Sequence, residues 1–312
     1  MKPRRTGSIF SPEQQERAPA VSETKIGRLE DLIARLESVV VAFSGGVDST
    51  LILALCLQVL GPDRVLAVTA NSPTLPRSEL DEAAALAREL GARHVIITTV
   101  ELQDERFATN PPDRCYYCKQ ELFTRLRTVA DREGCKHIVY GATAADLGDL
   151  RPGMRAAREA GAIAPLLDAG FTKEDVRSLS QQLGLRTWDK PAMACLSSRF
   201  PYGTRITQEN LRRVERGEHL LRHQLGFRQV RVRQHDSIAR IEIHPEEFPR
   251  LLEELTRGHI ISQFKKLGYT YVTLDLEGFR SGSMNEPLRA SSAQLSCHSG
   301  RSQTSLVPGS ER

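Results

Sequence analysis

The sequence predicts an α/β protein in which a doubly wound parallel sheet is followed by a smaller C-terminal α+β domain. Strand-like and helix-like segments alternate up to about residue 190, and the strand-like segments are apolar throughout, as strands buried on both faces are. The pattern changes after residue 206. We therefore predict a first domain at 26–190, a loop at 191–206 and a second domain at 207–287, flanked by disordered tails at 1–25 and 288–312.

The first domain contains four strand-like segments, each followed by a longer segment. In order they are VVVAF and LILALCLQVL, VLAVTA and SELDEAAALARELG, HVIITTV and the helix-like segment 116–133, then HIVYG and a stretch rich in Gly, Arg and Pro. A further helix is predicted from Thr172 to about Leu183, with Asp175 as the partner of Thr172 in a capping-box-like pair. In such sheets ligands bind at the carboxyl ends of the strands.

The second domain follows a segment without a sustained period, residues 184–206, which predicts a long functional loop. An amphipathic helix is expected from Gln208 to Leu225. QVRVR and IARIEI then alternate like two half-exposed strands. A helical stretch at 245–267 and a strand, YTYVTLDL, complete this smaller unit.

Composition restricts the class of protein. A chain of 312 residues with 40% hydrophobic content can build two cores. It contains no run near the roughly 20 apolar residues of a membrane span and no apolar signal segment at its start, so we expect no membrane partner and a cytoplasmic location. The net charge of +4 is too balanced to favour nucleic acid, and six cysteines do not make a disulfide scaffold.

The most informative segment joins the first strand to its helix. A turn rich in glycine and hydroxyl groups at a helix N-terminus directs N–H groups and partial positive charge at one point, which suits a phosphate. The alternative is a turn that only caps the helix. The candidate phosphate-binding residues are Ser44, Gly45, Gly46, Asp48, Ser49 and Thr50.

The form of this turn selects among nucleotide sites. A Walker-type loop needs a lysine after its glycines, and a dinucleotide fingerprint needs a third glycine; neither is present. The motif S-G-G-x-D-S resembles the PP-loop of ATP pyrophosphatases, an adenine nucleotide hydrolase-like fold. The resemblance implies ATP as substrate, AMP and pyrophosphate as products, and an adenylated carboxylate or amide. Asp48 is then a candidate ligand of the Mg²⁺ that accompanies ATP.

Cys195 lies in the loop string PAMACLSSRFPYG, four residues before Arg199. A cysteine near cations can ionise to a nucleophilic thiolate, which makes Cys195 a candidate nucleophile. From the residues alone the alternative, a buried cysteine that packs as a small apolar group, stays open.

Several strings together resemble the LarE family of ATP-dependent sulfur transferases. They are the PP-loop, the cysteine loop, GDLRPG at 148–153 and LDLEGFRSGSMN at 274–285, and the likeness extends from about residue 26 to 287. It implies that a pyridinium dicarboxylate mononucleotide is adenylated and then thiolated, in the synthesis of the nickel-pincer cofactor of lactate racemase. It also implies that Cys195 takes the place of the family's nucleophile.

Cys115 and Cys118 form a C-x-x-C pair that alone fits a metal half-site, a redox dithiol or coincidence. The resemblance implies a [4Fe-4S] cluster on Cys115, Cys118 and Cys195 that carries the transferred sulfide. The alternative is a sacrificial reaction in which Cys195 gives up its own sulfur and becomes dehydroalanine. The other cysteines, Cys56, Cys135 and Cys297, are interpreted as structural or incidental.

Arg231 and Arg233 alternate along one strand and so share a face, where two guanidiniums suit a phosphate. A solvated basic face is the alternative, and the resemblance favours the substrate phosphate. Glu242 is a candidate for binding Mg²⁺ or orienting substrate, against a carboxylate paired with arginine. In GATAAD, which departs from the family's usual string, Asp146 remains a candidate.

Two other functions stay open from the sequence. A PP-loop tRNA thiolase also combines a C-x-x-C with a later cysteine, although the balanced charge provides no obvious RNA surface. A nucleotide-binding sensor would bind ATP without catalysis. The resemblance further implies self-association into a homo-oligomer.

Overall fold

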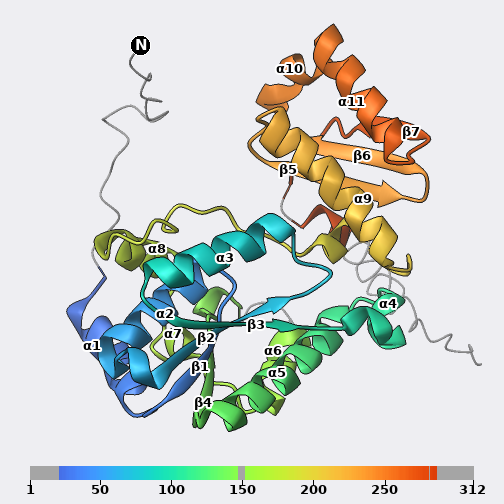
Figure 1. The fold of residues 1–312 in the computed structure, drawn as a ribbon. Coiled ribbons are helices and arrows are strands. Elements are labelled where there is room, and N and C mark those ends of the chain that lie inside the picture. Colours follow the sequence, from blue (N-terminus) through green and yellow to red (C-terminus); the bar gives the residue numbers. More distant parts are fainter. Residues whose placement is uncertain (1–20, 147–151, 281, 287–312) are drawn as a thin grey trace, which may run out of the picture. The chain divides into compact units, whose positions relative to one another are not determined.

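The structure is a computed structural model, and it describes residues 21–146, 152–280 and 282–286 (Figure 1). The chain divides into two compact units, Met1–Cys195 and Leu196–Arg312. Among the helices in the described ranges, none has the length and apolar character needed to cross a membrane. The predicted C-terminal tail, Cys297 and most of the GDLRPG string lie outside the described residues.

The first unit contains a four-stranded sheet in the order β3-β2-β1-β4, with every neighbouring pair parallel. Its strands are β1 (Val39–Ala42), β2 (Val65–Asn71), β3 (Arg93–Thr98) and β4 (His137–Tyr140). The order reverses between β1 and β4, so the turn after β1 lies at the switch point where such sheets bind ligands. The predicted parallel sheet is confirmed.

Helices cover both faces of this sheet (Figure 1). The first face buries apolar residues of α1 (Glu23–Ala34), α2 (Val47–Leu60), α3 (Arg77–Glu89), α7 (Pro165–Asp168) and α8 (Lys173–Gln182). The opposite face buries those of α5 (Arg114–Glu133) and α6 (Pro152–Glu159). A short helix, α4 (Glu105–Ala108), precedes α5. Because both faces are covered, the central strands β1 and β2 are apolar and buried over most of their length, whereas the edge strand β3 is largely exposed.

Three boundaries of the first unit differ from the sequence prediction. Helix α1 begins at Glu23, inside the predicted tail, because Val21 is buried and Lys25 makes an ion pair of 2.5 Å with Asp175. Helix α5 begins before the C-x-x-C pair rather than after it. Helix α6 occupies part of the stretch rich in Gly, Arg and Pro for which the sequence predicted no helix.

The predicted capping box of α8 is confirmed. The Thr172 hydroxyl accepts a hydrogen bond of 3.2 Å from the Asp175 N–H, and the Asp175 carboxylate accepts one of 2.8 Å from the Thr172 N–H. Two N–H groups at the helix start are thereby satisfied. The cap fixes the first residue of the helix, Lys173.

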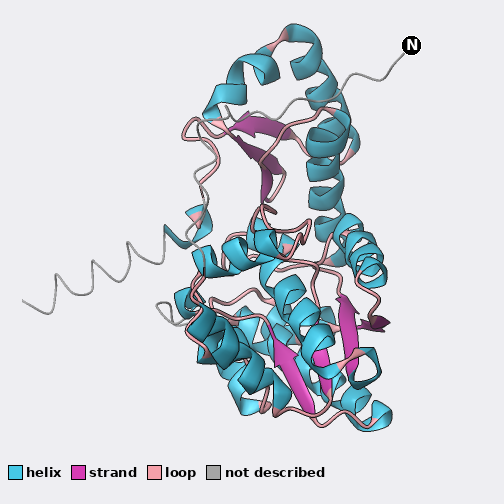
Figure 2. Ribbon diagram, turned by 90° about the vertical axis from the view of Figure 1, so that its left-hand side faces the viewer, coloured by secondary structure: helices cyan, strands magenta, loops and turns pink. Residues whose placement is uncertain are grey.

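The second unit packs helices on a three-stranded sheet (Figure 2). Strands β5 (Val230–His235) and β6 (Ile238–Ile243) are antiparallel, and β7 (Tyr271–Leu274) runs parallel to β6. Its helices are α9 (Gln208–His219), which continues as a π-helical turn over Leu220–Gln224, then α10 (Phe248–Leu252) and α11 (Glu254–Lys266).

The second unit differs from its prediction in two ways. Strand β5 is buried on both faces rather than half-exposed, and β6 is buried except at Ile238 and Arg240, because Arg233 pairs with the buried Glu242. The helical stretch expected at 245–267 is present, but it is interrupted at Glu253, whose extended ψ of 137° separates α10 from α11.

Candidate active site

The PP-loop occupies the turn from β1 into α2, and it is held by its own hydroxyl groups. The Ser44 and Ser49 hydroxyls lie 3.1 Å apart, and the Ser49 hydroxyl also donates to the Gly46 carbonyl at 3.1 Å. Gly45 has a φ of +70°, and a Cβ there would stand 3.1 Å from the Cβ of Ala83. The loop therefore needs glycine at this position both for its backbone conformation and for its close approach to α3.

The loop after β4 closes against the start of α2. A Cβ on Gly141 would lie 2.8 Å from the carbonyl carbon of Asp48 and 2.8 Å from the Ser49 nitrogen. No side chain fits in that space, and the collision would be with backbone atoms that cannot move independently. Gly141 therefore lets β4 approach the PP-loop, which brings the residues after β4 to the same edge of the sheet.

Lys173 supplies the positive charge that the PP-loop motif lacks. Its ammonium group lies 2.6 Å from one carboxylate oxygen of Asp48 and 3.8 Å from the carboxylate of Asp146. Asp146 also accepts hydrogen bonds from the N–H and the hydroxyl of Thr143, at 2.9 and 3.1 Å. The sequence prediction missed Lys173, although its position directly after the recognised cap residue was a usable signal.

Two polar atoms of the loop are buried without a hydrogen-bond partner among the described residues. They are the second carboxylate oxygen of Asp48 and the hydroxyl of Thr50. A buried acceptor without a donor is costly, so each such atom needs an explanation. For Asp48 a cation bound with the ATP phosphates provides one, since Mg²⁺ is commonly held by one or two carboxylates together with phosphate oxygens.

A cavity of about 520 Å³ opens beside the loop. Its walls come from the PP-loop, from the segments after β2, β3 and β4, from the start of α5 and from residues 190–195. This volume lies within the range of ligand pockets, roughly 300–1,000 Å³. Of the predicted site residues, the cavity brings together Ser44, Gly46, Asp48, Ser49, Cys115, Cys118 and Cys195.

The C-x-x-C pair lies in the first turn of α5, where residues three apart share a face. Burial, together with the nearby Glu101 carboxylate, raises the pKa of the Cys118 thiol to about 12. Burial also raises the pKa of Cys115, whose thiol lies among protein atoms although the residue as a whole is exposed. Cys195 lines the same cavity as Cys115 and Cys118.

Glu101 is a second residue that the sequence prediction missed. It is 2% exposed, and one of its carboxylate oxygens accepts a short hydrogen bond from the Ser72 hydroxyl. The other oxygen is buried without a hydrogen-bond partner among the described residues. Ser72 follows β2 and Glu101 follows β3, so the signal available in the sequence was their position after two adjacent strands.

The three cysteines fit an iron–sulfur cluster in kind and in location, because each is a thiol and all line one cavity. Across the described ranges, however, no three His, Cys, Asp or Glu side chains are gathered closely enough to hold a metal ion. Binding a metal centre therefore requires the three sulfur atoms to move closer together. It also requires Cys118 to lose its proton, since the thiolate is the ligand.

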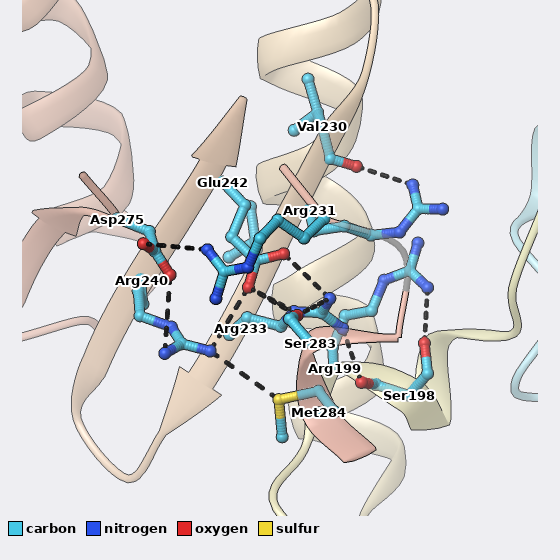
Figure 3. A network of polar contacts seen from close by, with 12 residues as sticks. Ser198, Arg199, Val230, Arg231, Arg233, Arg240, Glu242, Asp275, Ser283 and Met284 are labelled. Atoms are coloured by element: carbon cyan, nitrogen blue, oxygen red, sulfur yellow. Dashed lines mark hydrogen bonds and ion pairs between the residues drawn. The ribbon is translucent and has the colours of Figure 1, made fainter. Parts of the chain in front are cut away.

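The arginines of β5 are buried in the second unit, within a cluster of charged side chains (Figure 3). Arg233 donates two hydrogen bonds to Glu242, at 3.0 and 2.8 Å, and one of 2.9 Å to the Ser283 hydroxyl. Arg240 also reaches Glu242, at 3.3 Å. Glu242 is thus fully buried and neutralised by arginine, so it does not fit the Mg²⁺ role predicted for it.

A second pair in this arginine cluster has the same form. Arg199 donates to both carboxylate oxygens of Glu218, at 2.7 and 2.9 Å. Burial acts to raise the pKa of Glu218, but Arg199 outweighs that effect and holds the pKa below its usual range. Bidentate pairing of this kind satisfies a buried carboxylate. The two glutamates, Glu218 and Glu242, therefore neutralise the charges of Arg199 and Arg233.

Arg231 differs from the other two arginines. Its guanidinium donates 2.8 Å to the Val230 carbonyl and lies 5.0 Å from the centre of the Phe279 ring, and no ion pair joins it to a carboxylate of the described residues (Figure 3). Burial, together with the charge of Arg199, lowers the pKa of Arg231 to about 10. Three buried arginines thus face two buried glutamates, and the excess positive charge belongs to Arg231.

The remaining cysteines of the described part of the chain lie elsewhere. Cys56 is buried in α2, where burial raises its pKa to about 12, and Cys135 is buried between α5 and β4. Neither lines the cavity. Their packing agrees with the structural role predicted for them.

Comparison with known proteins agrees with the class that the parallel sheet and its loop define, a PP-loop ATP pyrophosphatase. A family model described as NAD synthase matches residues 29–137. An NH(3)-dependent NAD(+) synthetase of Chlorobaculum tepidum is 31% identical over 166 residues, 51% of this chain and 58% of that protein. The likeness to this relative is confined to about half of each chain.

Two relatives that match this chain over nearly their whole length identify the family within this class. The pyridinium-3,5-bisthiocarboxylic acid mononucleotide synthase of Lactiplantibacillus plantarum is 45% identical over 269 residues, 86% of this chain and 96% of that enzyme. An uncharacterised protein of Synechocystis is 44% identical over 266 residues, 85% of this chain and 98% of its own length. The chain belongs to the LarE family, the family of this synthase, and is an ATP-dependent sulfur transferase.

Proposed function

We propose that this enzyme uses ATP to adenylate a carboxylate of pyridinium-3,5-biscarboxylic acid mononucleotide and then replaces a carboxylate oxygen by sulfur. The observation that supports this most directly is one cavity lined by both a PP-loop and three cysteines. The name of the Lactiplantibacillus relative, a bisthiocarboxylic acid mononucleotide synthase, supports the same substrate and product. The product serves the nickel-pincer cofactor of lactate racemase.

The first half-reaction needs a site for the ATP phosphates. N–H groups at the start of α2 and its dipole attract them. Asp48 would hold Mg²⁺ through its unpartnered oxygen, and the ion would neutralise phosphate charge. The ammonium group of Lys173, which pairs with Asp48 at 2.6 Å, lies where it could also donate a hydrogen bond to a phosphate oxygen. The substrate carboxylate attacks the α-phosphorus, and pyrophosphate leaves.

The second half-reaction needs a sulfur nucleophile. Sulfur attacks the carbonyl carbon of the acyl-adenylate, a C–S bond forms and the C–O bond to AMP breaks. A [4Fe-4S] cluster on Cys115, Cys118 and Cys195 would supply a sulfide at the iron that lacks a protein ligand. The exposed position of Cys195 on the cavity wall gives an acyl-adenylate access to the sulfur there.

Arg231 is proposed to bind the phosphate of the mononucleotide. It is a buried cation without a carboxylate partner among the described residues, and a phosphate would supply the missing negative charge. Arg233 contributes through the one N–H that remains after four of its five donors bind Glu242, Ser198 and Ser283, and Glu242 orients it. Self-association and a cytoplasmic location remain predictions of the sequence.

The test is mass spectrometry of the intact protein before and after reaction with ATP, Mg²⁺ and the dicarboxylate mononucleotide, with iron measured on the protein reconstituted without oxygen. The cluster proposal expects about four irons per chain, an unchanged chain mass and a thiolated product. Cys118→Ala should lose the iron, whereas Cys135→Ala, a cysteine outside the cavity, should keep it.

Three other outcomes would contradict the proposed function in different ways. A colourless protein that loses the mass of one H₂S per chain, with dehydroalanine at position 195, would establish the sacrificial mechanism. ATP binding without pyrophosphate release on addition of the mononucleotide would leave only the nucleotide-binding sensor. Thiolation of bulk tRNA in its place would establish the tRNA thiolase.

A further inference from the structure

Lys190 is a buried lysine that joins three parts of the first unit. Its ammonium group lies 3.2 Å from the Gly45 carbonyl of the PP-loop, 2.9 Å from the Glu79 carboxylate and 3.0 Å from the Glu82 carboxylate. Its side chain is 14% exposed. An ammonium group has three N–H donors, and here three acceptors use them. The side chain is therefore fixed from three directions.

The backbone around Lys190 is fixed as well. Arg177 of α8 donates hydrogen bonds to the carbonyls of Trp188, at 2.7 Å, and of Lys190, at 3.0 Å. The next five residues, 191–195, form neither helix nor strand and end at Cys195. We call them the cysteine loop. Five residues span at most about 18 Å when extended, so an anchor at Lys190 limits where Cys195 can be.

The Gly45 contact gives this anchor a second role. Gly45 belongs to the loop that is expected to hold the ATP phosphates, and Cys195 lines the same cavity. A single side chain thus links the backbone of the PP-loop to the start of the cysteine loop. Glu79 and Glu82 lie on α3, one turn apart, and hold the ammonium group in place.

We propose that Lys190 is a positioning residue that sets the cysteine loop against the PP-loop, so that sulfur captures the acyl-adenylate before water does. This inference rests on the proposed function. Water attacking the acyl-adenylate would release AMP and return the carboxylate, so ATP would be consumed without thiolation. Lys190 also lines the cavity, but its three N–H donors are used by Gly45, Glu79 and Glu82, so its proposed action is through the relative position of the two loops.

The measurement is the ratio of thiocarboxylate formed to AMP formed, in one reaction with ATP, Mg²⁺ and the dicarboxylate mononucleotide. We expect Lys190→Met to lower this ratio by roughly tenfold to a hundredfold, the effect of displacing a reacting group by about 1 Å. Lys190→Arg keeps a cation and several donors, and should restore much of the ratio. The ratio is independent of how many molecules are folded, because unfolded protein makes neither product.

Arg186→Met is the matched control. Arg186 pairs with Glu82 at 3.5 Å and with Glu89 at 2.9 Å, so it is anchored on the same helix and shares one carboxylate with Lys190, but neither of these ion pairs involves the PP-loop or the cysteine loop. This variant should keep the ratio of the unmodified enzyme. Lys190→Met leaves the carboxylates of Glu79 and Glu82 without the ammonium group, which could destabilise the fold. The double variant Lys190→Met/Glu82→Gln removes one of these charges. It should show the same low ratio if the loss of the Lys190 contacts, and not misfolding, lowers the ratio.

Equal loss of AMP and thiocarboxylate in Lys190→Met would overturn the inference, because Lys190 would then only support the ATP site. A low ratio in Arg186→Met would also overturn it, since the effect would then come from α3. Failure of the proposed function looks different: the unmodified enzyme would release no AMP when given the mononucleotide.

Discussion

The cavity at the PP-loop and the arginine cluster of the second unit bury charge with opposite imbalances. In the cavity, one oxygen of Asp48 and one of Glu101 are buried without a donor among the described residues. In the arginine cluster, the carboxylates are satisfied and Arg231 is the cation left without an acidic partner. The cavity therefore lacks a cation or a donor, and the cluster lacks an anion.

This difference indicates which ligand each region is built for. A phosphate chain with its magnesium ion brings the positive charge that Asp48 lacks, and a phosphate monoester brings the negative charge that Arg231 lacks. Charges buried without partners destabilise the protein alone, and they favour the state in which a ligand is bound. Substitutions in each region should therefore change different kinetic quantities.

The largest effect is expected for Cys195→Ala. It removes one of the three sulfur ligands of the proposed cluster, so thiocarboxylate formation should fall by roughly a thousandfold or more, as when one member of a catalytic unit is lost. AMP formation should continue, because the PP-loop is unchanged. Chromatography of both products checks this. Cys135→Ala is the control; loss of AMP together with the thiocarboxylate would assign Cys195 to the ATP site instead.

Asp48→Asn should come next. It keeps the shape of the side chain but removes the charge shared by Lys173 and the expected Mg²⁺, and the AMP-forming rate should fall by roughly a hundredfold to a thousandfold. The variant should also need more Mg²⁺ for half of its maximal rate, which a titration measures. Asp63→Asn, on the exposed segment after α2, should change neither quantity. An unaltered Mg²⁺ requirement would exclude Asp48 as the ligand.

Arg231→Met tests the opposite imbalance. The KM for the mononucleotide should rise by roughly tenfold to a hundredfold, the value of charged hydrogen bonds, while the KM for ATP stays unchanged. The melting temperature should rise, because an apolar side chain replaces a buried cation that has no acidic partner. We expect the free energy of unfolding to increase by about 1 kcal/mol or more. Arg228→Met, at an exposed arginine just before β5, should change neither value.

The pH dependence of this stabilisation follows from the lowered pKa of Arg231. The pKa falls from 12.5 to about 10 on folding, so the unfolded chain binds the proton more tightly. Below about pH 10 Arg231 is protonated in both the folded and the unfolded chain, so its full destabilisation of the folded state is present. That destabilisation decreases only as the pH rises above about 10. The stability gained in Arg231→Met should therefore be constant between about pH 6 and about pH 9, and calorimetry can measure it. A gain that varies across this range would mean that another group is responsible.

The sequence predicted the parts of the cavity that are local along the chain. The PP-loop residues are consecutive, and the alternation of apolar segments placed them at a sheet edge. It did not predict the pairing of Asp48 with Lys173, which are 125 residues apart, or that of Gly45 with Lys190, which are 145 apart. A lysine and an acidic residue on separate segments carry no signal of contact until the sheet brings them together.

The arginine cluster was predicted less completely for a related reason. The alternation of Arg231 and Arg233 located the cations, but the same alternation also fits a solvated strand face. Burial of both depends on Glu242 of the next strand and on Ser283, 50 residues beyond Arg233. Periodicity shows which residues share a face, and it does not show whether a distant segment covers that face.

The smallest effect is expected at the cap that fixes Lys173 beside the cavity. Burial raises the pKa of Asp175, but hydrogen bonds from Lys25 and Thr172 outweigh it and bring the pKa below the ordinary 3.8. The stabilisation by the Asp175 charge is therefore complete above about pH 4, and it is lost as the pH falls through the lowered pKa of the folded state.

Asp175→Asn should lower the free energy of unfolding by about 1 kcal/mol at pH 7, measured by denaturant unfolding, and the difference from the unmodified protein should shrink in acid. A cost that stays constant down to about pH 2 would show that the Asp175 charge contributes nothing. AMP formation should fall only severalfold, since Lys173 keeps its place in the chain and loses only part of its support.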